Sequence, residues 1–299
     1  MKTALECLPC YLRQAMQVAR ISTDDAALQL ETMRVVAGLT TKMDMAKTPP
    51  ENSVAVYQAI AAITDCADPY LEVKKESNRQ ALAQLPAFSE IVAGSEKPLG
   101  TALRLAIGGN IIDYGAMRSF DADAAMERCL HAEYVVDSSL ELLQQIKGLK
   151  NGAKVLYLAD NSGEIVYDSL VVKELAGLGL DVTVVVKSGA IINDALIGDA
   201  LACGMDTYAT ILENGTSCPG TPLGSCSQEL QLAFQDADLI LSKGQGNFET
   251  LSEVEADIFF LLTVKCTVVG VHLAEISKTV KDKLPGNGEL VLYYHNGCT

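Results

Sequence analysis

Apolar residues recur at helical spacing along the first half of the chain. Residues 53–63 (SVAVYQAIAAI) and 134–146 (YVVDSSLELLQQI) repeat hydrophobic side chains at this spacing, which predicts helices with one buried face. After residue 150 the pattern changes to short runs rich in β-branched residues, namely KVLYLA, DVTVVVK, DLILS, CTVVGVHL and ELVLYYH. Helical patterns such as 164–177 separate most of these runs. Strands that alternate with helices predict a mostly parallel sheet.

The change of pattern predicts two domains. Asn151-Gly152, within LKNGAK (149–154), is a turn signal between a helix and a strand. We therefore expect a helical domain at residues 1–150 that covers the site, and an α/β domain at residues 151–299 that carries it. The predicted fold class is α/β, with a helical N-terminal half joined to a C-terminal three-layer α/β/α domain that has a mostly parallel, Rossmann-like sheet.

Composition and charge narrow the choice of partner. The chain has 299 residues, of which 49% are hydrophobic and 20% charged, as in a well-packed globular protein. A formal net charge of −15 repels phosphate backbones, so we expect no nucleic-acid partner. Glu6 and Arg13 interrupt any signal-peptide core, and Lys265 interrupts the apolar stretch 258–273, which is too short to span a membrane. We expect a cytoplasmic protein with a small-molecule partner, and the sequence carries no signal for an oligomeric state.

Polar residues follow three of the predicted strands. KVLYLA is followed by Asp160-Asn161-Ser162-Gly163-Glu164, DVTVVVK by a loop that contains Asn193-Asp194, and DLILS by Lys243-Gly244-Gln245-Gly246-Asn247. The carboxyl ends of parallel strands meet at one edge of a sheet, where ligands bind. We therefore expect these side chains to share one crevice.

The three strand ends together have the chemistry of a phosphoryl-transfer site. Carboxylate and amide oxygens suit a hard divalent cation such as Mg²⁺ or Mn²⁺. Lys243 and the glycine-rich backbone of KGQGN suit an anion. Helix capping explains Asp160-Asn161 or Asn193-Asp194 equally well when each is taken alone. The functional interpretation depends on all three ends lying in one sheet.

Cysteines offer a second, weaker candidate site. Cys7 and Cys10 have CxxC spacing, but the sequence has no second CxxC, and the nearest candidate pair is Cys218 with Cys226. The odd total of nine cysteines disfavours a disulfide framework. An ion at Cys7 and Cys10 is one interpretation, and two thiols one helical turn apart without a metal is the other.

Two further segments have no regular helix or strand pattern. GGNIIDYG (108–115) interrupts the helical half with paired glycines and Asn110. ENGTSCPGTPLG (213–224) is rich in Gly, Pro, Ser and Thr, as is typical of a lid or specificity loop.

These motifs resemble a known family in their order along the chain. ECLPCYLRQA, GGNIIDYG, YLADNSGEIVYD, INDA, ENG…PGT and SKGQGNFETL are similar to segments of the metal-dependent damage-control phosphatases, formerly a family of unknown function and also described as resembling an acidic-residue methyltransferase. The resemblance runs from residue 6 to about residue 270. The CLPC segment resembles the prokaryotic branch.

The resemblance implies an activity and a set of residues. It implies hydrolysis of phosphate monoesters, particularly sugar phosphates and damaged metabolites, with Mg²⁺, Mn²⁺, Co²⁺ or Ni²⁺. The implied metal ligands are Asp160, Asn161 and Asp194. The implied substrate-binding segment is Gln245 to Glu249, preceded by Lys243, with a further lysine at Lys265. The chain departs from the family pattern beside Asp194, where it reads AIINDAL and not PVINDAT, and in NGTSCPGT, which lacks an aspartate.

We therefore expect a metal-dependent phosphatase. Asp160, Lys243 and Glu164 are the candidate catalytic residues, with attack by water or by Asp160 itself. The candidate substrate-binding residues are Gln245, Gly246, Asn247, Lys265, Asn110 and Arg13, the last two contributed by the helical half together with Gln14.

Three alternatives remain open at this point. One is an S-adenosylmethionine-dependent carboxylate methyltransferase, although the first strand end lacks the usual GxG turn. Another is a non-enzymatic, cysteine-rich metal-binding or redox protein that uses Cys7, Cys10, Cys218 and Cys226. The last is a regulator that binds phosphosugars without turnover.

Overall fold

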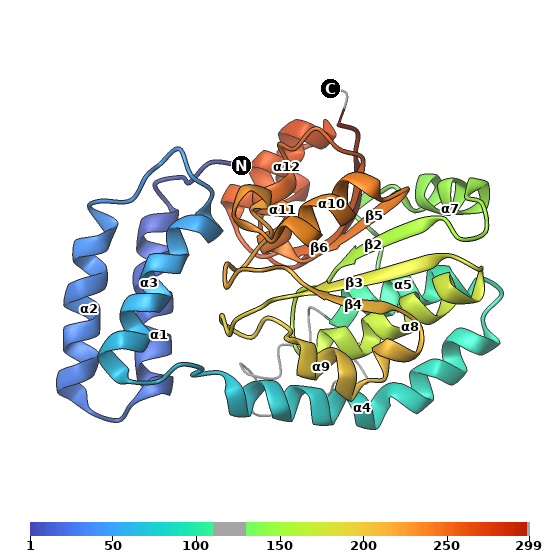
Figure 1. Ribbon diagram of the computed structural model, residues 1–299. Helices are drawn as coiled ribbons and strands as arrows, with labels where there is room; N and C mark the ends of the chain where they lie inside the picture. Colours follow the sequence, from blue (N-terminus) through green and yellow to red (C-terminus); the bar gives the residue numbers. More distant parts are fainter. Residues whose placement is uncertain (110–129, 298–299) are drawn as a thin grey trace.

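One sheet organises the protein. The computed structural model describes residues 1–109 and 130–297. The described strands pair in the order β1-β7-β6-β5-β2-β3-β4, and Figure 1 labels β2 to β6 of this sheet. Neighbouring strands are parallel except β6 and β7, which pair antiparallel. The strands are β1 (Val136–Asp137), β2 (Lys154–Leu158), β3 (Asp181–Val186), β4 (Thr210–Glu213), β5 (Leu239–Lys243), β6 (Ile258–Val264) and β7 (Glu289–His295). The predicted α/β class with a mostly parallel sheet is confirmed.

Helices cover both faces of the sheet and bury a separate core on each. Residues of the helices on one face pack in a cluster with Val155, Tyr157 and Val184, and residues of the helices on the other face pack in a cluster with Leu156, Leu158 and Val185. This alternation along β2 and β3 is what a strand buried on both faces requires. The first face carries α4 (Leu71–Gly94), α5 (Pro98–Gly109), α7 (Ser139–Gly148), α8 (Glu164–Gly177) and α9 (Ile197–Ala202), and the second carries α10 (Gln228–Asp236), α11 (Gln245–Leu251) and α12 (Thr267–Ser277).

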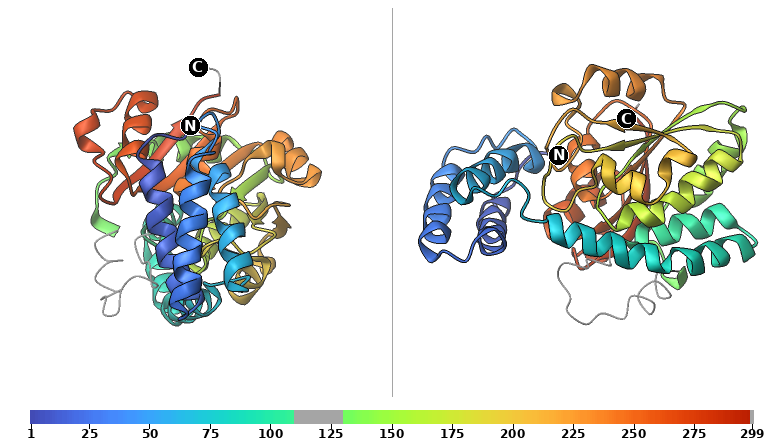
Figure 2. Two further views of the ribbon diagram at one scale, coloured as in Figure 1. Left: turned by 90° about the vertical axis from the view of Figure 1, so that its left-hand side faces the viewer. Right: turned by 60° about the horizontal axis from the view of Figure 1, so that its bottom comes forward.

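The first three helices form a unit beside these layers, which we call the three-helix unit. It consists of α1 (Cys7–Ser22), α2 (Ala26–Thr40) and α3 (Pro49–Thr64), which lie side by side in two views (Figure 2). Its own core includes Tyr11, Val36 and Val56. A capping box between Thr48 and Glu51 begins α3, so that orphan backbone N–H groups at the helix start are satisfied.

The division of the chain at residue 150 remains a prediction. On its N-terminal side, α4, α5 and α7 pack against the sheet and β1 is one of its strands. Their buried residues belong to the cores of the sheet's two faces. The part of the helical half that stands apart from the sheet is therefore the three-helix unit.

The structure corrects one predicted strand. The run CTVVGVHL (266–273) is not a strand, because α12 begins at Thr267 and its buried residues Val269, Gly270, Leu273 and Ala274 recur at helical spacing. The strand here is β6, which lies just before this run. Burial of one helical face outweighed the strand preference of the β-branched residues.

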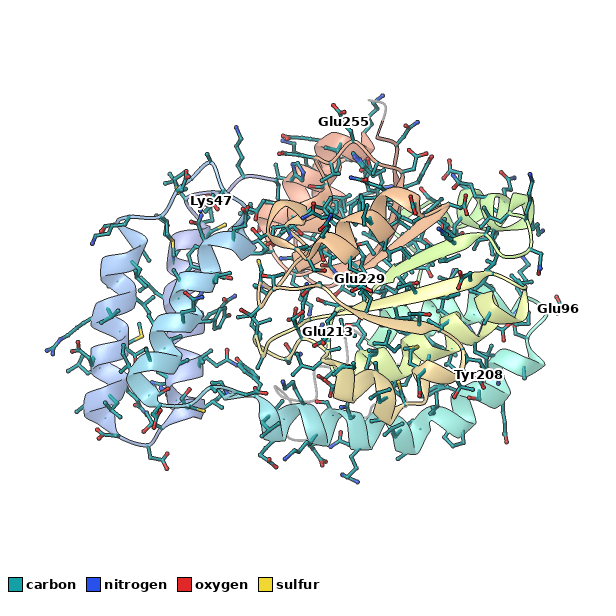
Figure 3. The ribbon with its side chains drawn as sticks, in the orientation of Figure 1. Lys47, Glu96, Tyr208, Glu213, Glu229 and Glu255 are labelled. Carbon is teal, nitrogen blue, oxygen red and sulfur yellow. The ribbon has the colours of Figure 1, made fainter. Side chains whose placement is uncertain are left out.

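Acidic side chains are distributed over the surface of the protein. Exposed glutamates are spread widely, with Glu96 and Glu255 at separate edges of the molecule (Figure 3). Within residues 1–109 and 130–297, no helix is long and apolar enough to cross a membrane.

Candidate metal and phosphate site at the strand ends

The ends of β2 and β3 are held together by backbone contacts. Asn161 and Asp194 form an isolated antiparallel bridge. On either side of it, the Ala195 N–H donates to the Asp160 carbonyl at 2.8 Å and the Ser162 N–H to the Asn193 carbonyl at 2.9 Å. The three residues predicted to hold a metal, Asp160, Asn161 and Asp194, are therefore brought together.

Helix α4 closes over this loop. The Gly163 N–H donates to Asn78 Oδ1 at 2.6 Å, and a Cβ on Gly163 would lie 2.9 Å from the Cβ of Ser77. Gly163 also has φ +77, a conformation that favours glycine. The approach of α4 was not predicted, because Asn78 and Gly163 are 85 positions apart in the sequence.

The end of β5 packs directly on Asp160. Gly244 has φ +79, and a Cβ there would lie within the Asp160 carboxylate, 1.9 Å from Oδ2. The Asn247 amide donates to the Ala159 carbonyl at 3.1 Å and to the Lys243 carbonyl at 2.9 Å. Glycine at 244 is thus required for the Asp160 carboxylate to occupy its position.

Gln245 and Gly246 link α11 to its surroundings. Gln245 donates to Glu249 at 2.8 Å and accepts from the Lys265 N–H at 2.9 Å. Gly246 lies against the 213–224 loop, where a Cβ would meet the Pro219 carbonyl. Burial raises the pKa of Glu249 to about 7.

Lys243 lies in a fully buried ion-pair cluster, which we call the closed cluster. Its Nζ donates to Glu164 Oε1 at 2.5 Å, Asp168 Oδ1 at 2.7 Å and the Ala106 carbonyl at 2.9 Å. The Tyr157 hydroxyl also donates to Asp168 Oδ1, at 2.7 Å. Burial alone would lower the pKa of Lys243, but Asp168 and Glu164 raise it above its ordinary value. All three lysine protons thus have acceptors within the protein.

Lys187 forms a looser cluster at the end of β3, which we call the open cluster. Its Nζ donates to the Gly220 carbonyl at 2.7 Å and to Asn247 Oδ1 at 3.5 Å, and lies 3.6 Å from Asp194 Oδ2. Asp194 Oδ2 is buried and has no hydrogen-bond donor among the described residues. Lys187 was not predicted as a site residue, although it ends the run DVTVVVK that leads to Asp194.

The carboxylates near the open cluster are poorly neutralised. Burial raises the pKa of Asp194 to about 8, with Lys187 opposing the rise and Asp160 adding to it. Burial also raises the pKa of Asp160 to about 6, and the charge of Glu164 adds to this, while Lys265, Lys187 and Lys243 oppose it. A cation placed among these groups would favour their charged forms.

The residues fit a hard divalent cation by their chemistry. The Asn161 amide nitrogen donates to Asp160 Oδ2 at 2.7 Å and to Glu164 Oε2 at 2.9 Å, so its Oδ1 is the atom left to act as a ligand. Among the residues that the structure describes, no group of three or more His, Cys, Asp or Glu side chains is placed to hold a metal. The candidate set is therefore two carboxylates and one amide, all oxygen donors that Mg²⁺ and Mn²⁺ accept.

The other predicted site residues lie in different places. Lys265 is exposed beside Gln245, and Arg13 is exposed on α1. Asn110 lies outside the described residues. Cys7 and Cys10 are partly buried in the first turn of α1, and an ion there stays a prediction.

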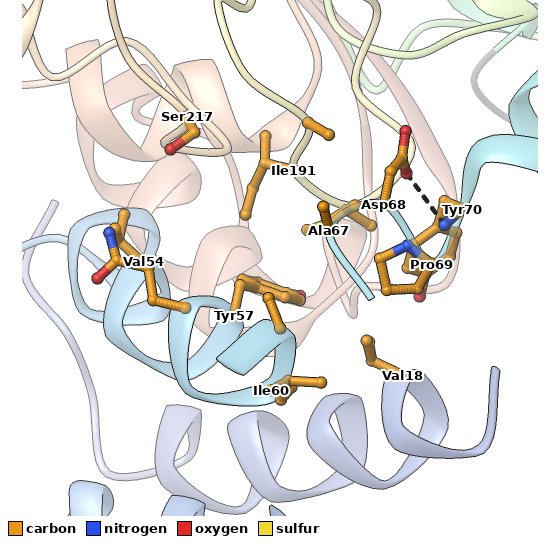
Figure 4. A pocket seen from close by; sticks show the side chains of 14 residues that line it. Val18, Val54, Tyr57, Ile60, Ala67, Asp68, Pro69, Tyr70, Ile191 and Ser217 are labelled. Atoms are coloured by element: carbon orange, nitrogen blue, oxygen red, sulfur yellow. Dashed lines mark hydrogen bonds between the residues drawn. The ribbon is translucent and has the colours of Figure 1, made fainter. Parts of the chain in front are cut away.

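A pocket lies beside the open cluster, between α3 and the loop before Asp194 (Figure 4). Tyr57, Ile191 and Ser217 lie around it. Its wall includes Ile192, which has φ +45. A β-branched residue with positive φ is strained, and such strain is common at ligand sites.

The fold and the strand-end clusters define an α/β protein whose polar groups meet at the edge of the sheet that binds ligands in this class. The chain belongs to the damage-control phosphatase family: a model of the damage-control phosphatase ARMT1-like domain matches residues 3–280. The predicted family is confirmed, and membership supports a phosphatase role.

Relatives match over nearly the whole chain. The damage-control phosphatase PH1575 of Pyrococcus horikoshii is 32% identical over 91% of this chain and 94% of its own length. A damage-control phosphatase of Archaeoglobus fulgidus is 33% identical over 94% of this chain and 100% of its own length. The crystal structure of the DUF89 family protein PH1575 superimposes with a TM-score of 0.86 at 30% identity, covering 99% of this chain and 100% of that one.

Proposed function

We propose that this chain is a metal-dependent phosphatase that hydrolyses small phosphate monoesters, sugar phosphates or damaged phosphorylated metabolites among them. The observation that carries the proposal is the open cluster, in which the buried Asp194 Oδ2 has no hydrogen-bond donor among the described residues and lies beside Asp160 and Asn161. The family of the chain supports the same reaction.

In this proposal Asp160, Asn161 and Asp194 hold one divalent ion, Mg²⁺, Mn²⁺, Co²⁺ or Ni²⁺. The ion would supply Lewis-acid stabilisation of charge on a phosphoryl oxygen. Glu164 accepts from the Asn161 amide at 2.9 Å and thereby turns the amide carbonyl toward the ligand position. Lys243 holds Glu164 at 2.5 Å, so we assign Lys243 a positioning role.

Two other lysines supply positive charge where phosphate would bind. Lys187 lies 3.6 Å from Asp194 Oδ2, and Lys265 is exposed beside Gln245. Both oppose the rise in the pKa of Asp160, so their charges act at Asp160. This local charge is what an anionic substrate needs near a protein of net charge −15.

In this proposal the carboxylate of Asp160 is the group that acts on the substrate. It lies against Gly244 and accepts from Asn161 at 2.7 Å. It acts either as the nucleophile or by taking a proton from an attacking water.

The test is hydrolysis of an aryl phosphate after chelation, then with each of the four metals added back. We expect metal-restored turnover that Asp160→Ala and Asp194→Ala abolish. Asp181→Ala is the matched control, because Asp181 is an exposed aspartate at the opposite end of β3. Folded wild-type protein that turns over no ester with any metal would refute the proposal.

The same preparations separate the alternatives. Binding of S-adenosylmethionine, measured by calorimetry, would favour the methyltransferase. Metal that remains bound in Asp160→Ala would favour a thiolate site. Ester binding without turnover would favour a regulator.

A further inference from the structure

The pocket beside the open cluster is small. Its walls come from α1, α3, residues 67–70, residues 190–192 and Ser217, and its volume is about 70 Å³. At roughly 10–15 Å³ for each water-sized group, it takes on the order of five such groups. It therefore fits one substituent of a small molecule and not an entire phosphate ester.

The lining is mostly apolar, and several of its polar groups are already engaged. Val54, Ile60 and Ile191 are among the apolar residues around it (Figure 4). The Tyr57 hydroxyl donates to Gln14 Oε1 at 2.9 Å. Asp68 lies 2.6 Å from the Lys74 Nζ and accepts from the Tyr70 N–H at 3.1 Å. A hydroxyl-rich group would lose its water here and regain few hydrogen bonds.

The pocket and the phosphate site share two loops. The Asp194 N–H donates to the Ile191 carbonyl at 3.1 Å, so the residue at the pocket wall sets the turn that carries Asp194. On the other loop, Ser217 lines the pocket and the Gly220 carbonyl accepts from Lys187 at 2.7 Å. Ser217 also lies close to Gly189, where a Cβ would be 3.1 Å from the Ser217 Cβ.

Tyr57 of α3 lies near both the pocket and the proposed phosphate site. It lines the pocket, and after burial and Tyr70 the charge of Asp194 is the next cause that raises its pKa. Tyr57 is thus within electrostatic range of Asp194, one of the proposed metal ligands.

We propose that this pocket binds the organic group of the phosphate ester, and that the group it accepts is compact and weakly polar: an aryl ring or a short alkyl chain. Tyr57 and Ile191 then determine specificity, one from the three-helix unit and one from the loop before Asp194. The inference rests on the proposed function for the position of the phosphate.

The test measures binding, so that it does not depend on turnover. Calorimetry with the full chain and Mn²⁺ compares phenylphosphonate, a hydroxylated alkyl phosphonate and inorganic phosphate. We expect phenylphosphonate to bind at least tenfold more tightly than the other two. Ala61→Leu fills the pocket from α3, since Ala61 lines it, and should reduce this preference at least tenfold.

Ala62→Leu is the matched control, because Ala62 is the next residue of α3 and is exposed. It should keep the preference of the wild type. If Ala61→Leu does not fold, Val54→Phe fills the same pocket from two helical turns away on α3.

The outcomes separate this inference from the proposed function. Equal affinities in the wild type, no binding of any of the three compounds, or an unchanged preference in the folded filled variants would overturn the inference. A clear phenylphosphonate preference lost in those variants, in a protein that hydrolyses no ester, would support the pocket and refute the phosphatase.

Discussion

The closed and open clusters both pair a buried lysine with carboxylates near the carboxyl edge of the sheet. They differ in the distance between the lysine Nζ and the carboxylate oxygens. In the closed cluster Lys243 reaches two carboxylates at 2.5 and 2.7 Å. In the open cluster Lys187 approaches Asp194 only to 3.6 Å and gives its shortest hydrogen bond to a backbone carbonyl. A buried charge is tolerated when it is closely paired. The loose pairing therefore leaves Asp194 less neutralised than the carboxylates of the closed cluster, and a bound cation would neutralise it.

The largest expected effect comes from breaking the closed cluster. Lys243→Met leaves Glu164 and Asp168 buried without their cation, and we expect unfolding free energy to fall by about 3–5 kcal/mol. Urea denaturation followed by circular dichroism measures this. Added Mn²⁺ should restore little of the loss, and a variant as stable as the wild type would contradict the assignment of Lys243 to a structural pair.

The same substitution in the open cluster should act mainly on function. We expect Lys187→Met to reduce kcat/KM for an aryl phosphate about 100-fold, which is roughly 2.7 kcal/mol of transition-state stabilisation. Its loss of stability should be smaller than that of Lys243→Met and should be largely recovered with Mn²⁺, because the metal would neutralise Asp194. Kinetics and denaturation on one preparation test both points. Full activity would remove Lys187 from the site.

The stability of the metal-free protein should depend on pH through the carboxylates near the open cluster. In the folded, metal-free protein the pKa values of Asp160 and Asp194 are raised to about 6 and about 8, above the value near 3.9 typical of unfolded chains. The folded state then binds more protons than the unfolded state, so stability should fall as pH rises from about 4 to 8.

Thermal melting in the presence of a chelator, at pH 5 to 8, measures this fall. The two raised pKa values together correspond to a fall of about 5 kcal/mol across this range. Asp194→Ala or added Mn²⁺ should flatten the profile. A profile that rises with pH in the chelated wild type would contradict the burial of these carboxylates.

The smallest effect is expected at the surface. Arg79 pairs with Glu76 at 2.6 Å, and both side chains are exposed. Exposed pairs contribute little, because water screens them. Arg79→Ala should leave the melting temperature and the activity unchanged within error. A loss of stability comparable to that of Lys243→Met would mean that burial does not explain why one ion pair matters more than another.

The sequence predicted the meeting of the strand ends better than the roles of the lysines. Asp160, Asn161 and Asp194 could be placed together because parallel strands end at one edge. Lys243 was expected to face phosphate, yet side chains alternate along a strand, and Leu239 and Leu241 belong to the core beneath α8. Counting in twos from Leu241 would have placed Lys243 on that face.

Other features depend on contacts that no local pattern contains. Asn78 meets Gly163 across 85 positions, and Ile191 meets Tyr57 around a pocket whose walls come from five segments of chain. The helix α12 was mistaken for a strand because its β-branched residues raise strand propensity. The helical spacing of the buried residues Val269, Leu273 and Ala274 was the pattern that indicated a helix.

The separate core of the three-helix unit has a consequence for how this protein can evolve. Tyr11, Val36 and Val56 hold the unit together independently of the two cores of the sheet, while Val54 and Ala61 of α3 form part of the pocket wall. Substitutions at Val54 or Ala61 reshape the pocket with little effect on the strand ends that carry Asp160 and Asp194. Substitutions in α3 can therefore change which substrate group the pocket accepts. We expect orthologues to differ in sequence at these two positions more often than at the strand ends of the sheet.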